Sequence, residues 1–219
     1  MTKVQNNPGV MNILYGRSLP RNWKDGISIS IRSEGRQTAG RQNNGVCLVT
    51  INGHAYLDGT TCQPGINALI VDQRSGGVSK INSFPRSTMG NGVVRRRFKA
   101  FVENITTSEI LVLVVSEDAA QYINTYRNLL ASLGQTNFPT TFLTDSSFAF
   151  IGSNRAPRPS WTTFQTKPAA GQASELDVQV PYYCADIFAN DLRNTWIKTL
   201  PVVTFVSRIE IELQHYTFN

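Results

Sequence analysis

Two uninterrupted apolar runs constrain the fold of this chain more than any other feature. The segments Ile66–Val71 and Ile110–Val115 are almost entirely aliphatic and show no polar–apolar alternation. Short runs of this kind predict β-strands that are covered on both faces. Phe148–Ile151, which ends at Gly152, predicts a third short central strand. The chain must therefore supply other elements on both sides of one sheet.

A first helix is predicted at Val93–Glu103, because its apolar residues fall on one helical face. Arg95, Arg96 and Lys99 lie off that face, which indicates that this basic run is the solvated side of the helix. The order of strand, helix and strand along the chain predicts a right-handed crossover and a parallel strand pair.

A second helix is predicted at Asp118–Leu133, where apolar residues recur at intervals of three and four. Ser116, Glu117 and Asp118 stand at its start, where side-chain oxygens can cap free amides. Gly134 stands where a left-handed C-terminal residue is favoured.

Other segments predict half-buried strands. Ile27, Ile29 and Ile31 alternate with polar residues, and Asn52-Gly53 is typical of a tight hairpin turn. The remaining predicted strands are Val46–Ile51, Ala55–Leu57, Val78–Phe84, Leu176–Tyr183 and Val202–Leu213, and a loop is predicted from Gly152 to about Ala173. The domain prediction is an N-terminal arm at 1–26, a domain at 27–168 and a C-terminal β extension at 169–219.

Composition and charge restrict the classes of function. The net charge is +6, but the basic residues are scattered and no aromatic platform accompanies them, so nucleic-acid binding is not expected. The N-terminus has no apolar h-region, which predicts no signal peptide, and no run is long enough to insert in a membrane.

The chemistry-bearing residues do not form a catalytic pattern. The two histidines, His54 and His215, belong to no nucleophile or metal motif, and Gly90-Asn91-Gly92 lacks the third glycine of a dinucleotide loop. We therefore predict no enzyme and no cofactor. Cys47, Cys62 and Cys184 favour three small core residues, although a Cys47–Cys62 bridge across a hairpin stays open.

Three carboxylates are candidates for ligand binding. Glu117 and Asp118 follow the strand Ile110–Val115, and Asp145 precedes the strand Phe148–Ile151. Ligands often bind at strand ends, whereas helix capping explains the first two without a ligand. Aromatic residues that could form either a core or a sugar-stacking surface are Trp161, Tyr182, Tyr183 and Trp196.

The order and spacing of several motifs resemble the ILEI/PANDER-like domain family (interleukin-like EMT inducer) over about residues 27–167. The motifs are Ile31–Gly35, Gly65–Asp72 with the turn Ser75-Gly76-Gly77-Val78, Phe101-Val102, Ile110–Asp118, Leu129–Gly134 and Asp145–Gly152.

The resemblance implies a lectin-like, β-rich sandwich with flanking helices, within a mixed α/β chain that adds C-terminal strands. It also implies no catalysis, and roles in extracellular signalling, carbohydrate binding or the surface proteins of microbes and phages. In a glycan-binding branch of the family, an acidic residue and two arginines hold the sugar. The acidic position matches Glu117, whereas the two arginine positions fall on Pro64 and Thr144.

These observations lead to one main expectation and one alternative. The main expectation is a structural and recognition subunit of a phage tail, baseplate or fibre, assembled into a virion in the host cytoplasm. Its partners would be other copies of the chain or other tail proteins. The alternative is a free-standing carbohydrate-binding module whose ligand is a cell-surface glycan.

Overall fold

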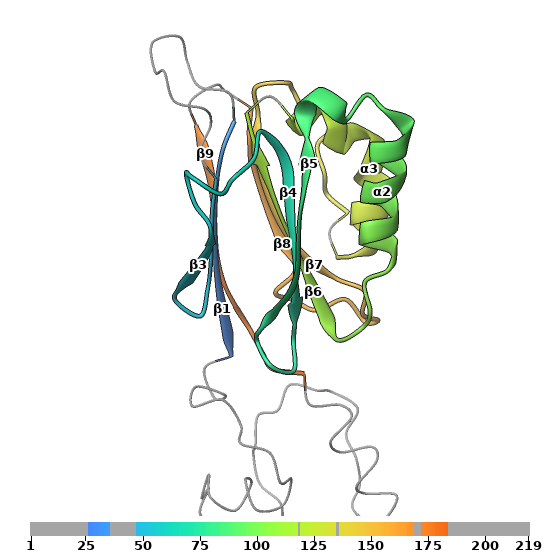
Figure 1. The fold of residues 1–219 in the computed structure, drawn as a ribbon. Helices are drawn as coiled ribbons and strands as arrows, with labels where there is room; N and C mark the ends of the chain where they lie inside the picture. The colour runs from blue at the N-terminus through green and yellow to red at the C-terminus, as the bar shows by residue number, and fades with distance from the viewer. Residues whose placement is uncertain (1–25, 36–46, 118, 135, 169–171, 184–219) are drawn as a thin grey trace, which may run out of the picture. The chain divides into compact units, whose positions relative to one another are not determined.

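Two antiparallel β-sheets pack face to face, and helices cover the outer face of the larger sheet (Figure 1). The computed structural model describes residues 26–35, 47–117, 119–134, 136–168 and 172–183. The arm predicted at 1–26, except for Gly26, and the strand predicted at Val202–Leu213 lie outside these described residues.

The larger sheet has the strand order β5-β4-β6-β7-β8. The apolar runs form its centre and are buried on both faces, as predicted. Its strands are β4 (Gly65–Asp72), β5 (Val78–Pro85), β6 (Glu109–Ser116), β7 (Ser147–Ser153) and β8 (Thr163–Lys167).

The predicted parallel strand pair is wrong. Every hydrogen-bonded pair in the larger sheet is antiparallel. Strands β5 and β6 do run in the same direction across their helical connection, but β4 lies between them and pairs with both. The strand–helix–strand order therefore predicted the relative direction of β5 and β6 correctly, but it did not predict that β4 would lie between them.

The first predicted helix is confirmed as α2 (Gly92–Glu103). Phe98 and Val102 are buried against the sheet, and the basic side chains are exposed. The Asn91 side chain accepts a hydrogen bond from the Val93 amide at 2.8 Å, so this asparagine serves as the N-cap. A short 3₁₀ turn, η1 (Arg86–Thr88), lies between β5 and α2.

The second helical region begins later than predicted. It consists of η2 (Ala120–Tyr122) and α3 (Ile123–Ser132), neither with a side-chain N-cap. Ser116 belongs to β6 and Glu117 to a β-bridge, so the predicted capping by these two residues is wrong. Gly134 is not left-handed helical but has a φ of 149°, and a Cβ there would lie 2.5 Å from the Thr162 side chain.

The smaller sheet has the order β3-β2-β1-β9. Its strands are β1 (Ile27–Glu34), β2 (Cys47–Ile51), β3 (His54–Leu57) and β9 (Ala173–Val180). The predicted alternation in β1 and the hairpin turn at Asn52-Gly53 are confirmed, the turn residues having φ values of 51° and 81°. Strand β9, from the predicted C-terminal extension, pairs with β1 along its whole length.

Two apolar layers hold the fold together. One lies between the sheets and includes Ile29, Val49 and Val112, and the other lies between the larger sheet and the helices and includes Phe98, Leu113 and Phe150. The described fold is therefore a mostly β sandwich with two short α-helices, so the broader term mixed α/β understates its β character. Strand β8 falls in a segment that was predicted as a loop.

Candidate functional site

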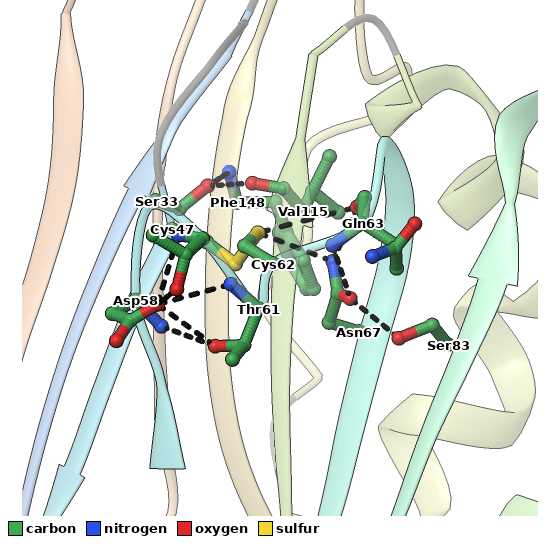
Figure 2. The surroundings of a disulfide bond; sticks show 11 residues. Ser33, Cys47, Asp58, Thr61, Cys62, Gln63, Asn67, Ser83, Val115 and Phe148 are labelled. Carbon is green, nitrogen blue, oxygen red and sulfur yellow. Dashed lines mark hydrogen bonds between the residues drawn. A yellow bond between two sulfur atoms is a disulfide. The ribbon is translucent and has the colours of Figure 1, made fainter. Parts of the chain in front are cut away.

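The end of β1 inserts between two strands of the opposite sheet. The β6–β7 register stops at the pair Val114 and Ala149. Beyond it, the buried Ser33 hydroxyl donates to the Val115 carbonyl at 2.6 Å and accepts from the Phe148 amide at 3.0 Å (Figure 2). The hydroxyl thus takes the place of the next hydrogen bond of the ladder and joins the two sheets.

Gly35 continues this insertion at very close range. It forms a parallel bridge with Glu117, and a Cβ at Gly35 would lie 2.2 Å from the Asp145 carbonyl oxygen. Any other residue would force the backbone apart here, because real Cβ atoms do not approach an oxygen so closely. Glycine is therefore required where β1 passes between the ends of β6 and β7.

The structure brings two of the three predicted carboxylate residues to this point. Glu117 and Asp145 lie on either side of Gly35 and are both half-buried. Glu117 has a φ of 59°, a left-handed conformation that is uncommon for residues other than glycine. Asp118 lies outside the described residues. Ligand binding by these residues stays a prediction.

The two positions that match arginines in the glycan-binding branch lie at the same end of the sheet. Gly65 pairs with Ser116, which places Pro64 beside Glu117, and Thr144 directly precedes Asp145. The Thr144 hydroxyl is directed to the Gln121 side chain at 3.4 Å. Pro64 and Thr144 therefore lie near Glu117 and Asp145, but neither residue carries a basic side chain.

A disulfide ties the smaller sheet to the connection that leads into the larger sheet (Figure 2). Cys47 on β2 is bonded to Cys62 in the connection from β3 to β4, with 5.8 Å between the Cα atoms. The favoured interpretation of free core cysteines was therefore wrong for this pair. Cys184 lies outside the described residues.

Asp58 organises the loop that carries Cys62. Its Oδ1 accepts four hydrogen bonds, from the amides and the hydroxyls of Thr60 and Thr61, at 2.7 to 3.0 Å. These bonds favour the ionised carboxylate and lower the pKa of Asp58 to about 2, with the Thr60 hydroxyl as the largest cause. The Asp58 carboxylate therefore stabilises the conformation of this loop.

Asn67 is a buried polar residue that our sequence reasoning passed over. Its Oδ1 accepts from the Gln63 amide at 3.1 Å and the Ser83 hydroxyl at 2.7 Å, and its Nδ2 donates to the Gln63 carbonyl at 2.8 Å. The signal was present, because an amide inside an apolar strand must find partners when it is buried.

For two of the four aromatic residues, the structure supports the core alternative. Trp161 and Tyr182 are half-buried and pack against the core between the sheets, and burial raises the pKa of Tyr182. The Arg155 guanidinium lies over the Tyr183 ring at 4.2 Å from its centroid. Trp196 and His215 lie outside the described residues, and His54 is exposed at the start of β3.

The described residues contain no group of three or more His, Cys, Asp or Glu side chains placed to hold a metal ion. Within the same part of the chain, no helix is long and apolar enough to cross a membrane.

Comparison with known families supports the predicted resemblance. The family model for the interleukin-like EMT inducer (ILEI) matches residues 64–155. The matched segment begins just before β4 and ends after β7, so it includes three central strands, both α-helices, Glu117 and Asp145. No curated protein matches the chain significantly.

Proposed function

The ILEI family model matches residues 64–155, and from this premise we propose that the protein is a non-catalytic structural and recognition subunit of a larger assembly. The proposed assembly is a virion, with the chain in a phage tail, baseplate or fibre. Its partners are other copies of the chain or other tail proteins. The description of the matching family is that of a cytokine-like protein, which supports recognition over catalysis.

The use of polar groups in the interior supports a role without catalysis. Ser33 and Asn67 are fully buried, and their side chains are bonded to backbone groups or to a neighbouring serine. Asp58 is likewise occupied by its own loop. An active site needs convergent polar groups that are left available to a substrate. In the described residues, these polar groups instead join strands and loops.

The open edge of β5 is the observation that carries the proposal. No strand of the described residues pairs with the outer edge of β5, and Ile81 on this strand is 45% exposed. A sheet edge of this kind presents free backbone groups to another chain. The opposite edge differs, because the Glu175 amide of β9 donates to the Gln165 side chain of β8 and so links the two sheets there.

The disulfide is compatible with the proposed location. Disulfides persist in oxidising environments, which include virion surfaces, and are rare in the reducing cytoplasm. A virion subunit that is made in the host cytoplasm would form the Cys47–Cys62 bond after the particle leaves the cell. Asp58 fixes the same loop through hydrogen bonds that do not depend on the oxidation of the cysteines.

Multi-angle light scattering coupled to size exclusion tests the proposal on the full chain. We expect a mass that is a multiple of the 24.3 kDa chain and that rises with protein concentration. A mass equal to one chain at every concentration up to about 100 μM would contradict it, because even complexes with a micromolar Kd would form there.

The alternative is a carbohydrate-binding module, and the convergence of Glu117 and Asp145 at Gly35 favours it as the second candidate. A glycan array probed with the full chain would show selective binding that is lost in Glu117→Gln and Asp145→Asn. The control is Glu103→Gln, which removes an exposed carboxylate from α2. Binding that survives both site variants would remove these carboxylates from the proposal, and an array without binding would reject the alternative.

A further inference from the structure

The outer edge of β5 has two chemically different sides. Ile81 pairs with Leu69, whose side chain lies in the core between the sheets, so Ile81 is on the side that faces the smaller sheet. Lys80 pairs with Ile70, whose side chain lies in the core beneath the helices, so Lys80 is on the helix side. The edge thus presents the apolar Ile81 next to the hydrogen-bonded Ser83 on one side, and Lys80 with Asn82 on the other.

Helix α2 adds to the basic character of the helix side. Phe84 of β5 contacts Phe98 and Phe101 of α2, with ring centroids 5.0 and 5.8 Å apart, so α2 packs beside this strand (Figure 1). The exposed Arg96 and Arg97 belong to the same helix. A strand added to β5 would meet Ile81 on one face and the positive charge of Lys80 and α2 on the other.

The chain itself contains a segment with this pattern. In the sequence 202–213, Ile209, Ile211 and Leu213 alternate with Arg208, Glu210 and Glu212, so the second set is acidic by one net charge. In an extended strand the first set points to one face and the second set to the other. The apolar face matches Ile81, and the two carboxylates match Lys80 and the arginines of α2. Both sides of the β5 edge thus find a complementary side in one segment.

We propose that residues 202–213 of one copy pair with the outer edge of β5 in a neighbouring copy. The proposal rests on the proposed function, since it names the contact that joins subunits. Main-chain hydrogen bonds would supply affinity, and the alternate side chains would fix the register. Because the two surfaces differ, each copy offers one of each, and the contact extends into a ring or a filament.

The exit of the chain from the domain permits this contact. The Tyr183 amide donates to the Gln73 carbonyl at 2.9 Å, which fixes the last described residues beside the turn between β4 and β5. Residues 184–201 can extend to roughly 60 Å at about 3.3 Å per residue. An eight-residue strand such as β5 is roughly 27 Å long. The linker is therefore long enough to reach a neighbouring molecule.

Cysteine cross-linking in the full chain tests the strand pairing, because only side chains on the same face of the sheet can form a disulfide. In a Cys184→Ser background, Ile81→Cys is combined in turn with cysteine at each position from 209 to 213. We expect mild oxidation to join copies at positions 209, 211 and 213 at least fivefold faster than at 210 and 212. Lys80→Cys should show the opposite preference, because side chains of opposite faces cannot form the bond.

A second measurement, the scattering mass of two lysine variants, tests the same edge in case a cysteine variant does not fold. Ile81→Lys should lower the scattering mass toward one chain, whereas Leu143→Lys, at a side chain that is 54% exposed, should leave it unchanged. Cross-links that form equally well at odd and even positions, or that form within one chain, would overturn the proposed pairing between copies. If the parent chain forms oligomers but shows no preference between odd and even positions, only this inference fails, whereas a monomeric parent chain rejects the proposed function as well.

Discussion

The two sheets of the sandwich are stabilised in different ways. The larger sheet is covered on one face by helices and on the other by the smaller sheet, and β4, β6 and β7 are buried throughout. The smaller sheet has one buried face, because alternate residues of β1 point outward. Hydrophobic burial dominates the stabilisation of the first sheet. The second is joined to it additionally by Ser33 and Gly35, and the Cys47–Cys62 bond ties β2 to the connection that enters β4.

This difference indicates where sequence change can be tolerated. Substitutions in the larger sheet remove apolar contacts that no other group can replace. The smaller sheet is attached mainly by its apolar inner face. A few polar and covalent links add to this attachment, so the loss of any one of them should weaken it by a smaller amount. Four measurements can test this contrast.

The largest effect should come from the centre of the larger sheet. Phe150→Ala removes a fully buried ring and should lower the free energy of unfolding by about 3–5 kcal/mol. Its cross-strand partner Phe164 on β8 is only half-buried, so Phe164→Ala should cost about 1–2 kcal/mol. Urea denaturation of both variants checks the difference. Equal losses would show that burial does not separate the centre of this sheet from its edge.

Loss of the disulfide should come next. The bond closes a sequence separation of 15 residues, for which chain entropy predicts about 3 kcal/mol of stabilisation. The double variant Cys47→Ser, Cys62→Ser should therefore unfold at a lower urea concentration than the parent chain. Cys184→Ser is the matched control. If adding reductant to the parent chain changes nothing, the bond does not contribute to the attachment of the smaller sheet.

The part of the fold that could be predicted from sequence follows from the same contrast. Strands buried on both faces, such as β6, must be apolar along their whole length, so their pattern is unambiguous. Strand β1 was predicted because its isoleucines alternate. Strand β8, Thr163–Lys167, was missed because its five residues are all half-buried and mostly polar. Nothing in such a segment distinguishes an edge strand from a loop.

The candidate site was predictable only in part. Glu117 and Asp145 were found because they stand at strand ends, and the structure places both beside Gly35. The role of Ser33 could have been inferred, since it occupies the next inward position after Ile27, Ile29 and Ile31. The cysteine pairing depends on how closely the connection from β3 to β4 approaches β2, and spacing along the chain does not determine that distance.

The Ser33 link should have an intermediate effect. Ser33→Ala leaves the Val115 carbonyl and the Phe148 amide without their hydroxyl partner in a buried place, which should cost about 1–3 kcal/mol. Ser30→Ala, on the outward side of the same strand, should change the free energy of unfolding by less than about 0.5 kcal/mol. Hydrogen exchange should show faster exchange of the Phe148 amide in the first variant alone. Unchanged exchange there would mean that β6 and β7 close without the serine.

The smallest effect should be a pH dependence that arises in the loop before the disulfide. The pKa of Asp58 is about 2 in the folded protein and 3.8 in the unfolded reference, so ionised Asp58 stabilises the fold. This contribution is fully present above pH 3.8 and is lost as the pH falls through about 2. Asp58→Asn should therefore flatten the fall in melting temperature between about pH 4 and pH 2. Asp177→Asn, on the exposed face of β9, is the control for removing a surface carboxylate. If both variants keep the parent profile, the threonine hydrogen bonds of Asp58 do not stabilise the connection from β3 to β4, and the disulfide alone secures that loop.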